Sequence, residues 1–122
     1  MGLNLKPRLV LIVEDEGLLR ILIADEFRLA GWQVLETDNG EDAIALLLQA
    51  SHPVDLVFTD IQLGGRLTGW DVGEQCRAIR SDVAVIYASG TAIDRSRRVD
   101  GGVFFNKPYA TDAVIAACQQ LI

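Results

Sequence analysis

The feature that most constrains the fold is a set of short apolar runs, each followed at once by a polar or charged residue. The clearest are residues 9–13, which precede Glu14, and residues 54–59, which precede Asp60. Both runs are too short for a core helix and are rich in branched residues, which is typical of strands buried on both faces. Strands of this kind predict a parallel sheet in an α/β fold.

Between the runs, apolar residues recur at helical spacing. The pattern predicts helices over residues 17–30, after a cap at residues 38–39, over residues 70–79 and after Thr111. Further short strands are predicted over residues 32–36, 83–88 and 103–105. Residues 92–99 are polar and contain three arginines, so they support at most a short helix. This alternation predicts a five-stranded parallel sheet with helices on both faces and a short or irregular fourth helix.

Length and charge narrow the classes of protein further. The chain has 122 residues, which suits a single domain over residues 1–122. Seventeen acidic residues against eleven lysines and arginines give a net charge of −6, which argues against direct binding of nucleic acid. No apolar run approaches the roughly 18 residues that a membrane helix requires. We therefore expect a soluble, cytoplasmic domain with no contact with membranes.

Polar residues collect at the predicted strand ends. Glu14 and Asp15 follow the first strand, Asp60 the third, Ser89 the fourth and Lys107 the fifth. The carboxyl ends of parallel strands share one edge of a sheet, where such folds bind ligands. Clustered carboxylates repel one another and need a cation, and hard oxygen ligands suit Mg²⁺. The nucleophile for an aspartyl phosphate could then be Asp60, with the Ser89 hydroxyl and the Lys107 ammonium on the phosphoryl oxygens.

Four strings of the sequence resemble the response-regulator receiver domain of two-component signalling. They are LVLIVEDE at residues 9–16, VDLVFTDI at residues 54–61, VIYASG at residues 85–90 and NKPY at residues 106–109. The resemblance spans essentially the whole chain, and the strings follow the order that the family has. It implies the flavodoxin-like receiver fold, with the strand order 2-1-3-4-5.

The resemblance also implies a ligand set for Mg²⁺. By position, Glu14 and Asp15 would form the acidic pair, with Asp15 the more direct metal ligand. Asp60 would be both the phosphoacceptor and a metal ligand. The backbone carbonyl of Gln62 would be a further ligand, and Lys107 would be the phosphate-binding lysine.

Residues beyond the metal site would switch and tune the domain. The resemblance implies that Ser89 is the switch hydroxyl and Phe104 the switch aromatic residue. The side chains of Gln62 and Thr91 fall where the family tunes its self-dephosphorylation. In this family, the peptide bond that precedes the position of Pro108 is usually cis.

Two departures from the family pattern concern the loops. Gly64 stands where the family usually has proline, and Gly69 lies nine positions after Asp60, so the loop is one residue longer. The interval from residue 89 to residue 107 is shorter than the family usually has, and the missing residues fall on the fourth helix. The string ASG at residues 88–90 resembles a subgroup of single-domain receivers that have a modified fourth helix.

The function that the resemblance implies is that of a stand-alone response regulator. A histidine kinase or a phosphotransfer protein would supply the phosphoryl group to Asp60 with Mg²⁺, which would switch a protein-interaction face toward an unknown downstream partner. Such a domain is not an enzyme in the usual sense, because it catalyses only its own phosphorylation and dephosphorylation. We expect a monomer or a weak homodimer.

Two other functions stay open. The first is a phosphorylation-independent interaction module with the same fold, which the unusual loop and the short fourth helix favour. The second is an aspartate-dependent phosphohydrolase, which would need a second aspartate at the position of Gln62.

Overall fold

The computed structural model describes residues 7–49, 53–91 and 94–122. Its five strands are β1 (Leu9–Val13), β2 (Gln33–Thr37), β3 (Leu56–Asp60), β4 (Ala84–Ser89) and β5 (Val103–Asn106). The helices of the same ranges are α1 (Gly17–Leu29), α2 (Gly40–Gln49), α3 (Gly69–Ile79) and α4 (Thr111–Leu121). All neighbouring strands are parallel, in the order β2-β1-β3-β4-β5, which confirms the predicted topology.

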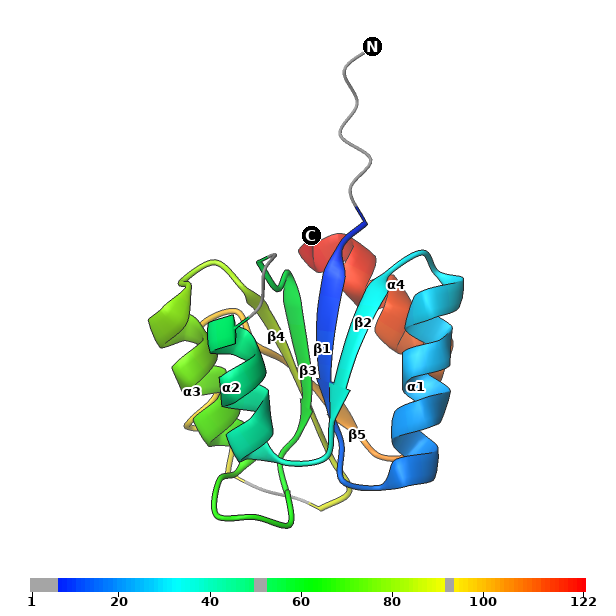
Figure 1. Cartoon of the computed structure of the whole chain (residues 1–122). Helices are drawn as coiled ribbons and strands as arrows, with labels where there is room; N and C mark the ends of the chain where they lie inside the picture. The colour runs from blue at the N-terminus through cyan, green and yellow to red at the C-terminus, as the bar shows by residue number, and fades with distance from the viewer. Residues whose placement is uncertain (1–6, 50–52, 92–93) are drawn as a thin grey trace.

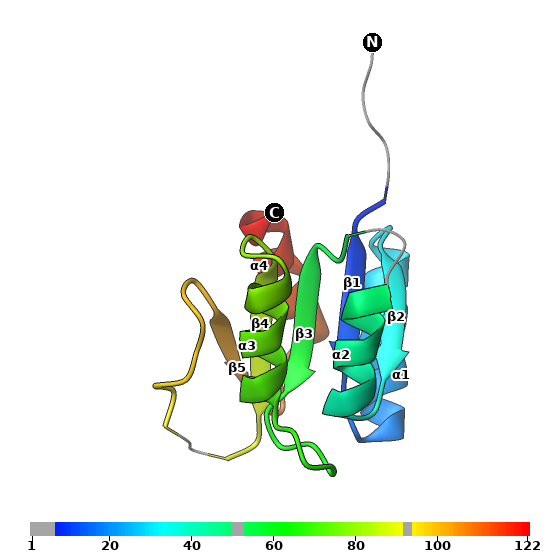
Figure 2. The same cartoon turned by 60° about the vertical axis from the view of Figure 1, so that its left-hand side comes forward.

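Helices cover both faces of the sheet. Helices α2 and α3 pack on one face, and α1 and α4 pack on the other (Figures 1 and 2). The strands run downward in Figure 1, so their carboxyl ends share the lower edge of the sheet. No helix in the described ranges combines the length and the apolar character that crossing a bilayer requires.

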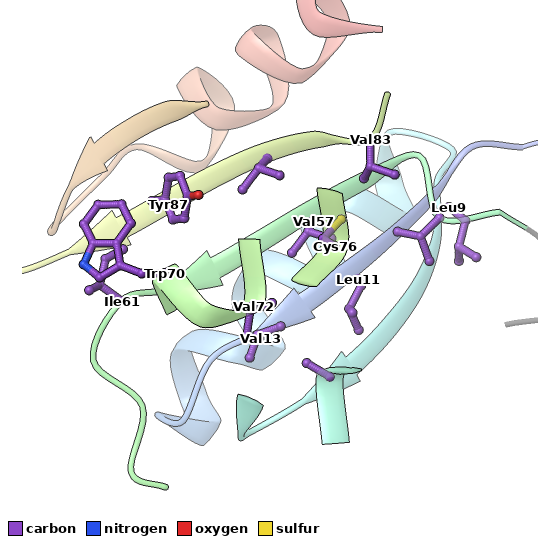
Figure 3. Close-up of a cluster of buried hydrophobic side chains, with 13 residues drawn as sticks. Leu9, Leu11, Val13, Val57, Ile61, Trp70, Val72, Cys76, Val83 and Tyr87 are labelled. Atoms are coloured by element: carbon purple, nitrogen blue, oxygen red, sulfur yellow. The ribbon is translucent and has the colours of Figure 1, made fainter. Parts of the chain in front are cut away.

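Strand β1 lies between two hydrophobic cores, one on each face of the sheet, and is therefore apolar on both of its faces. Its side chains are buried throughout, and alternate residues point to opposite faces of the sheet. Leu11 and Val13 join the core under α2 and α3, together with Val72 and Cys76 of α3 (Figure 3). The side chain of Ile12 points the other way, into the core under α1 and α4. A polar residue at any of these strand positions would lie in an apolar layer.

The predicted helix over residues 17–30 is confirmed, but its apolar stripe is wider than the face that it buries. Ile23 and Phe27 of α1 face the sheet and are fully buried. Leu18 and Leu22 lie on the solvent side, with exposed fractions of 69% and 52%. The apolar spacing therefore predicted the helix correctly and overestimated how much of it packs.

The connection from β4 to β5 is the least regular part of the fold. Its described residues, 90–91 and 94–102, form turns and no helix, which confirms the prediction of a short or irregular fourth helix. One turn is closed by the Arg98 N–H, which donates to the Arg95 carbonyl at 3.0 Å. A second is closed by the Gly102 N–H and the Val99 carbonyl at 2.9 Å. Helix α4 is therefore the helix that was predicted after Thr111.

Candidate functional site

Three carboxylates meet at the carboxyl edge of the sheet. Glu14 follows β1 and is fully buried, Asp60 ends β3 with 5% of its surface exposed, and Asp15 is exposed beside them. Each offers an oxygen, and these oxygens lie within 4.8 Å of one another. A compact set of carboxylate oxygens with one solvent-facing member fits Mg²⁺, which takes few protein ligands and keeps several waters.

Lys107 balances part of this negative charge. Its Nζ donates to Glu14 Oε1 at 2.7 Å and to Asp60 Oδ2 at 3.1 Å. The Lys107 N–H donates to the Ser89 carbonyl at 2.8 Å, which ties the end of β5 to the end of β4. The peptide bond between Lys107 and Pro108 is cis, as the resemblance implied.

The buried carboxylate of Asp60 holds its proton more strongly than an ordinary aspartate. Burial raises the pKa of Asp60 from 3.8 to about 7, with a further contribution from the Glu14 charge and an opposing one from Lys107. Burial also acts on Lys107, but hydrogen bonds and charge from Glu14 and Asp60 outweigh it and raise the pKa of the ammonium. A cation at this edge would favour the ionised form of Asp60, which is the nucleophilic form.

The predicted switch hydroxyl and tuning residues form a chain of contacts above this edge. The Thr91 N–H donates to Ser89 Oγ at 3.2 Å, and the two hydroxyl oxygens lie 3.3 Å apart. Gln62 Nε2 donates to Thr91 Oγ1 at 3.4 Å, across the loops that follow β3 and β4. The hydroxyl of Ser89 is thus held by Thr91 in this structure. The role of the Gln62 carbonyl as a metal ligand stays a prediction.

Phe104 lies apart from the carboxylates, in an aromatic group next to α3. Its ring stacks on Trp70 with centroids 6.4 Å apart, and Trp70 lies 4.6 Å from Tyr87. The guanidinium of Arg95 lies 3.8 Å from the centroid of the Phe104 ring. This cation–π contact was not expected, because the arginines of this segment are typical of a solvated face.

The start of α3 holds a second feature that the sequence reasoning missed. Thr68 and Asp71 form a capping box, in which the Thr68 N–H donates to Asp71 Oδ2 at 2.7 Å. The Gly69 N–H donates to the Ile61 carbonyl at 2.8 Å, and a Cβ on Gly69 would overlap the Asp60 carbonyl oxygen. The spacing T-x-x-D at residues 68–71 is the signal that could have located this cap.

Comparison with known proteins agrees with this arrangement. Residues 10–119 match the response regulator receiver domain family. The chain is 28% identical over 117 residues to the transcriptional regulatory protein PdtaR of Mycobacterium tuberculosis, covering 93% of this chain and 56% of that protein. It is 26% identical over 117 residues to sporulation initiation phosphotransferase F of Bacillus subtilis, covering 93% of this chain and 92% of that protein.

A solved structure gives the same answer. The response regulator receiver protein from Sinorhizobium medicae WSM419 superposes with a TM-score of 0.90 at 28% identity, over 97% of this chain and 96% of that one. The chain spans about half the length of the transcriptional regulators it matches. Because the family match covers nearly the whole chain and the fold agrees with it, this chain belongs to the response regulator receiver domain family.

Proposed function

We propose that Asp60 is a phosphoacceptor that takes a phosphoryl group from a phosphohistidine of a histidine kinase or phosphotransfer protein. The observation that carries this proposal is the contact of the Asp60 carboxylate with Lys107 Nζ at 3.1 Å, within a cluster of three carboxylates. A carboxylate oxygen of Asp60 would attack the phosphorus, the phosphorus–nitrogen bond would break, and the released imidazole would keep the electron pair and take a proton.

The protein groups around Asp60 have separate roles in this proposal. Glu14, Asp15 and Asp60, with the Gln62 carbonyl, would hold Mg²⁺, which when bound would neutralise charge on the phosphoryl oxygens. Lys107 already reaches two carboxylates and would move to a phosphoryl oxygen as the phosphoryl group arrives. Membership of the receiver family supports a signalling role of this kind.

The hydroxyls of the β4–β5 connection would respond to the phosphoryl group. Ser89 Oγ would exchange its contact with Thr91 for a phosphoryl oxygen, and Phe104 would follow inward as the switch aromatic residue. The bond between Gln62 and Thr91 joins the two loops beside Asp60, so both side chains would control the access of the water that ends the signal. This supports the roles in tuning that the resemblance implies.

We also propose that residues 1–122 act as a single receiver domain whose output is the binding of another protein. Phosphotransferase F of Bacillus subtilis, 92% of which aligns with this chain, offers a precedent in length for a receiver of this size. Phosphorylation would shift an existing equilibrium between two conformations, and a change from 1:99 to 99:1 requires about 5.5 kcal/mol of differential interaction.

Intact mass after incubation with acetyl phosphate and Mg²⁺ tests the proposal. We expect a gain of one phosphoryl group, about 80 Da, that requires Mg²⁺ and is absent in Asp60→Asn. Asp82→Asn is the matched control, because Asp82 is exposed and precedes β4 at the opposite edge of the sheet. If neither acetyl phosphate nor a phosphohistidine donor modifies the protein, and Mg²⁺ does not bind, a phosphorylation-independent interaction module is the better account. Rapid release of phosphate from a small-molecule donor, without accumulation of the modified protein, would instead indicate a phosphohydrolase.

A further inference from the structure

The connection from β4 to β5 contains a segment that is fastened to the body of the domain. Residues 94–99, here called the strap, lie outside the sheet next to α3 and β5 (Figure 2). Three separate contacts hold the strap: an ion pair to α3, a cation over an aromatic ring, and a backbone hydrogen bond to a buried tyrosine. The strap thus takes the place of a helix in covering this edge of the fold.

Arg97 makes the ionic contact. Its Nη2 lies 2.9 Å from Asp71 Oδ1 and 2.6 Å from Glu74 Oε1, and its Nε donates to Glu74 Oε2 at 3.2 Å. Asp71 and Glu74 lie three positions apart on α3, so both carboxylates lie on one side of that helix. The exposed fraction of the Arg97 side chain is 45%, so solvent and salt can reach these ion pairs, which are here called the latch.

The other contacts seat the strap on the aromatic group. The Arg95 guanidinium lies 3.8 Å from the centre of the Phe104 ring, and the Val99 N–H donates to Tyr87 Oη at 3.2 Å. The Tyr87 ring is fully buried and packs against Trp70, which stacks in turn on Phe104. Opening of the strap would therefore release the Phe104 ring and the Tyr87 hydroxyl, and it would loosen the packing of Phe104 against Trp70 of α3.

The latch shares a carboxylate with the loop that follows the phosphoacceptor. Asp71 Oδ1 accepts from Arg97, while Asp71 Oδ2 accepts from the Thr68 N–H and hydroxyl at 2.7 and 3.0 Å. Thr68 ends the loop that begins after Asp60, and the N–H of the next residue, Gly69, donates a hydrogen bond to the Ile61 carbonyl. Movement of this loop when Asp60 is occupied would reorient the carboxylate that holds Arg97.

We propose that the strap is an arginine-latched cover over Phe104 and the Tyr87 hydroxyl, next to Trp70 of α3, and that it opens when a phosphoryl group is held at Asp60. The opening step rests on the proposed function, whereas the latch does not. Movement of Phe104 inward would withdraw the ring from Arg95, and movement of the loop would weaken the hold on Arg97. Because coupling between two sites is reciprocal, release of the latch must also strengthen binding of a phosphoryl analogue.

The latch is tested first, without any ligand. Arg97→Gln is compared with Arg98→Gln in a Trp32→Phe background, so that Trp70 is the single tryptophan. Arg98 is a matched control, because it is exposed and has no side-chain hydrogen bond or ion pair to the described residues. We expect Arg97→Gln to raise the exchange rate of the Val99 amide about two- to fivefold, the range that exposed ion pairs support. Acrylamide quenching of Trp70 should rise with it. Equal effects of the two substitutions would overturn the latch.

The opening is tested with beryllium fluoride and Mg²⁺ as the phosphoryl analogue. In the wild type, the analogue should increase the exchange rate of the Val99 amide and the quenching of Trp70. The Arg97→Gln variant should bind the analogue more tightly than the wild type, by the same factor by which it raises Val99 exchange. Binding of the analogue with neither change overturns the coupling. Failure of the analogue to bind the wild type overturns the proposed function and the opening step with it, while the comparison of Arg97→Gln with Arg98→Gln still decides the latch.

Discussion

The buried carboxylate of Asp60 should cost the metal-free domain stability at neutral and higher pH. The raised pKa, about 7 against an ordinary 3.8, means that the folded protein binds a proton that the unfolded chain has released. Between about pH 4 and pH 7 the folded state therefore holds more protons, and the free energy of unfolding falls as the pH rises. An asparagine side chain is neutral at every pH, so Asp60→Asn removes this penalty.

The magnitude follows from the same pKa. At 1.36 kcal/mol per pKa unit, a rise from 3.8 to about 7 corresponds to about 4 kcal/mol when Asp60 is fully ionised. The cluster lies at an edge of the sheet where solvent reaches Asp15, and the effective dielectric is higher there than in the interior, so we expect about 1–3 kcal/mol. Without Mg²⁺, Asp60→Asn should thus be about 1–3 kcal/mol more stable than the wild type at pH 8, and the difference should vanish near pH 4.

Urea unfolding at pH 4, 6 and 8 without Mg²⁺ measures this difference. Asp82→Asn is a control of opposite sign, because its hydrogen bond to Arg80 lowers the pKa of Asp82 and the substitution removes that bond. Addition of Mg²⁺ at pH 8 should stabilise the wild type by mass action and affect Asp60→Asn less. The reasoning would be refuted if Asp60→Asn were no more stable than the wild type at pH 8, or if its advantage did not depend on pH.

Three further predictions concern the packing and charge around the site. Lys107→Met should lower the free energy of unfolding at pH 8 by about 1–3 kcal/mol, because it leaves a buried carboxylate unpaired, and should abolish the mass gain at Asp60. Gly69→Ala should cost about 1–3 kcal/mol in urea unfolding, because its Cβ meets the Asp60 carbonyl oxygen, whereas Gly17→Ala in α1 has space and should be neutral or stabilising. Thr68→Ala should cost about 1 kcal/mol through loss of the cap on α3, and an unchanged midpoint would contradict that assignment.

The sheet and the carboxylate cluster could be predicted because both depend on local sequence. Leu9–Val13 is apolar at every position, which only a doubly covered strand can bury, and the residue that follows such a strand must lie at the edge of the sheet. Glu14, Asp60 and Lys107 come together for this reason, although as many as 93 residues separate them in sequence. The topology of parallel strands supplied the long-range information that no single motif contained.

The contacts of the β4–β5 connection could not be predicted in the same way. Arg97 meets Asp71 across 26 residues, and no periodicity marks that pair, because neither residue lies in an apolar stripe. The three arginines of this segment instead suggested a solvated face, yet Arg95 covers an aromatic ring and Arg97 binds two carboxylates. Side chains that are long, charged and half exposed find their partners through tertiary geometry, which sequence pattern alone does not encode.

Lys107 and Asp60 have opposite effects on the stability of the metal-free fold, and this difference bears on how the site would bind a cation. Lys107 stabilises the carboxylate cluster from within, whereas the raised pKa of Asp60 shows that one ammonium does not compensate for burying two carboxylates. A cation that binds there would relieve a cost already present in the folded state. Binding of a cation would thus be favoured partly because it removes repulsion between carboxylates that the folded state already contains. Because the loop after Asp60 leads directly into the cap of α3, the proposed coupling would reach Asp71 and Arg97 through a few hydrogen-bonded contacts.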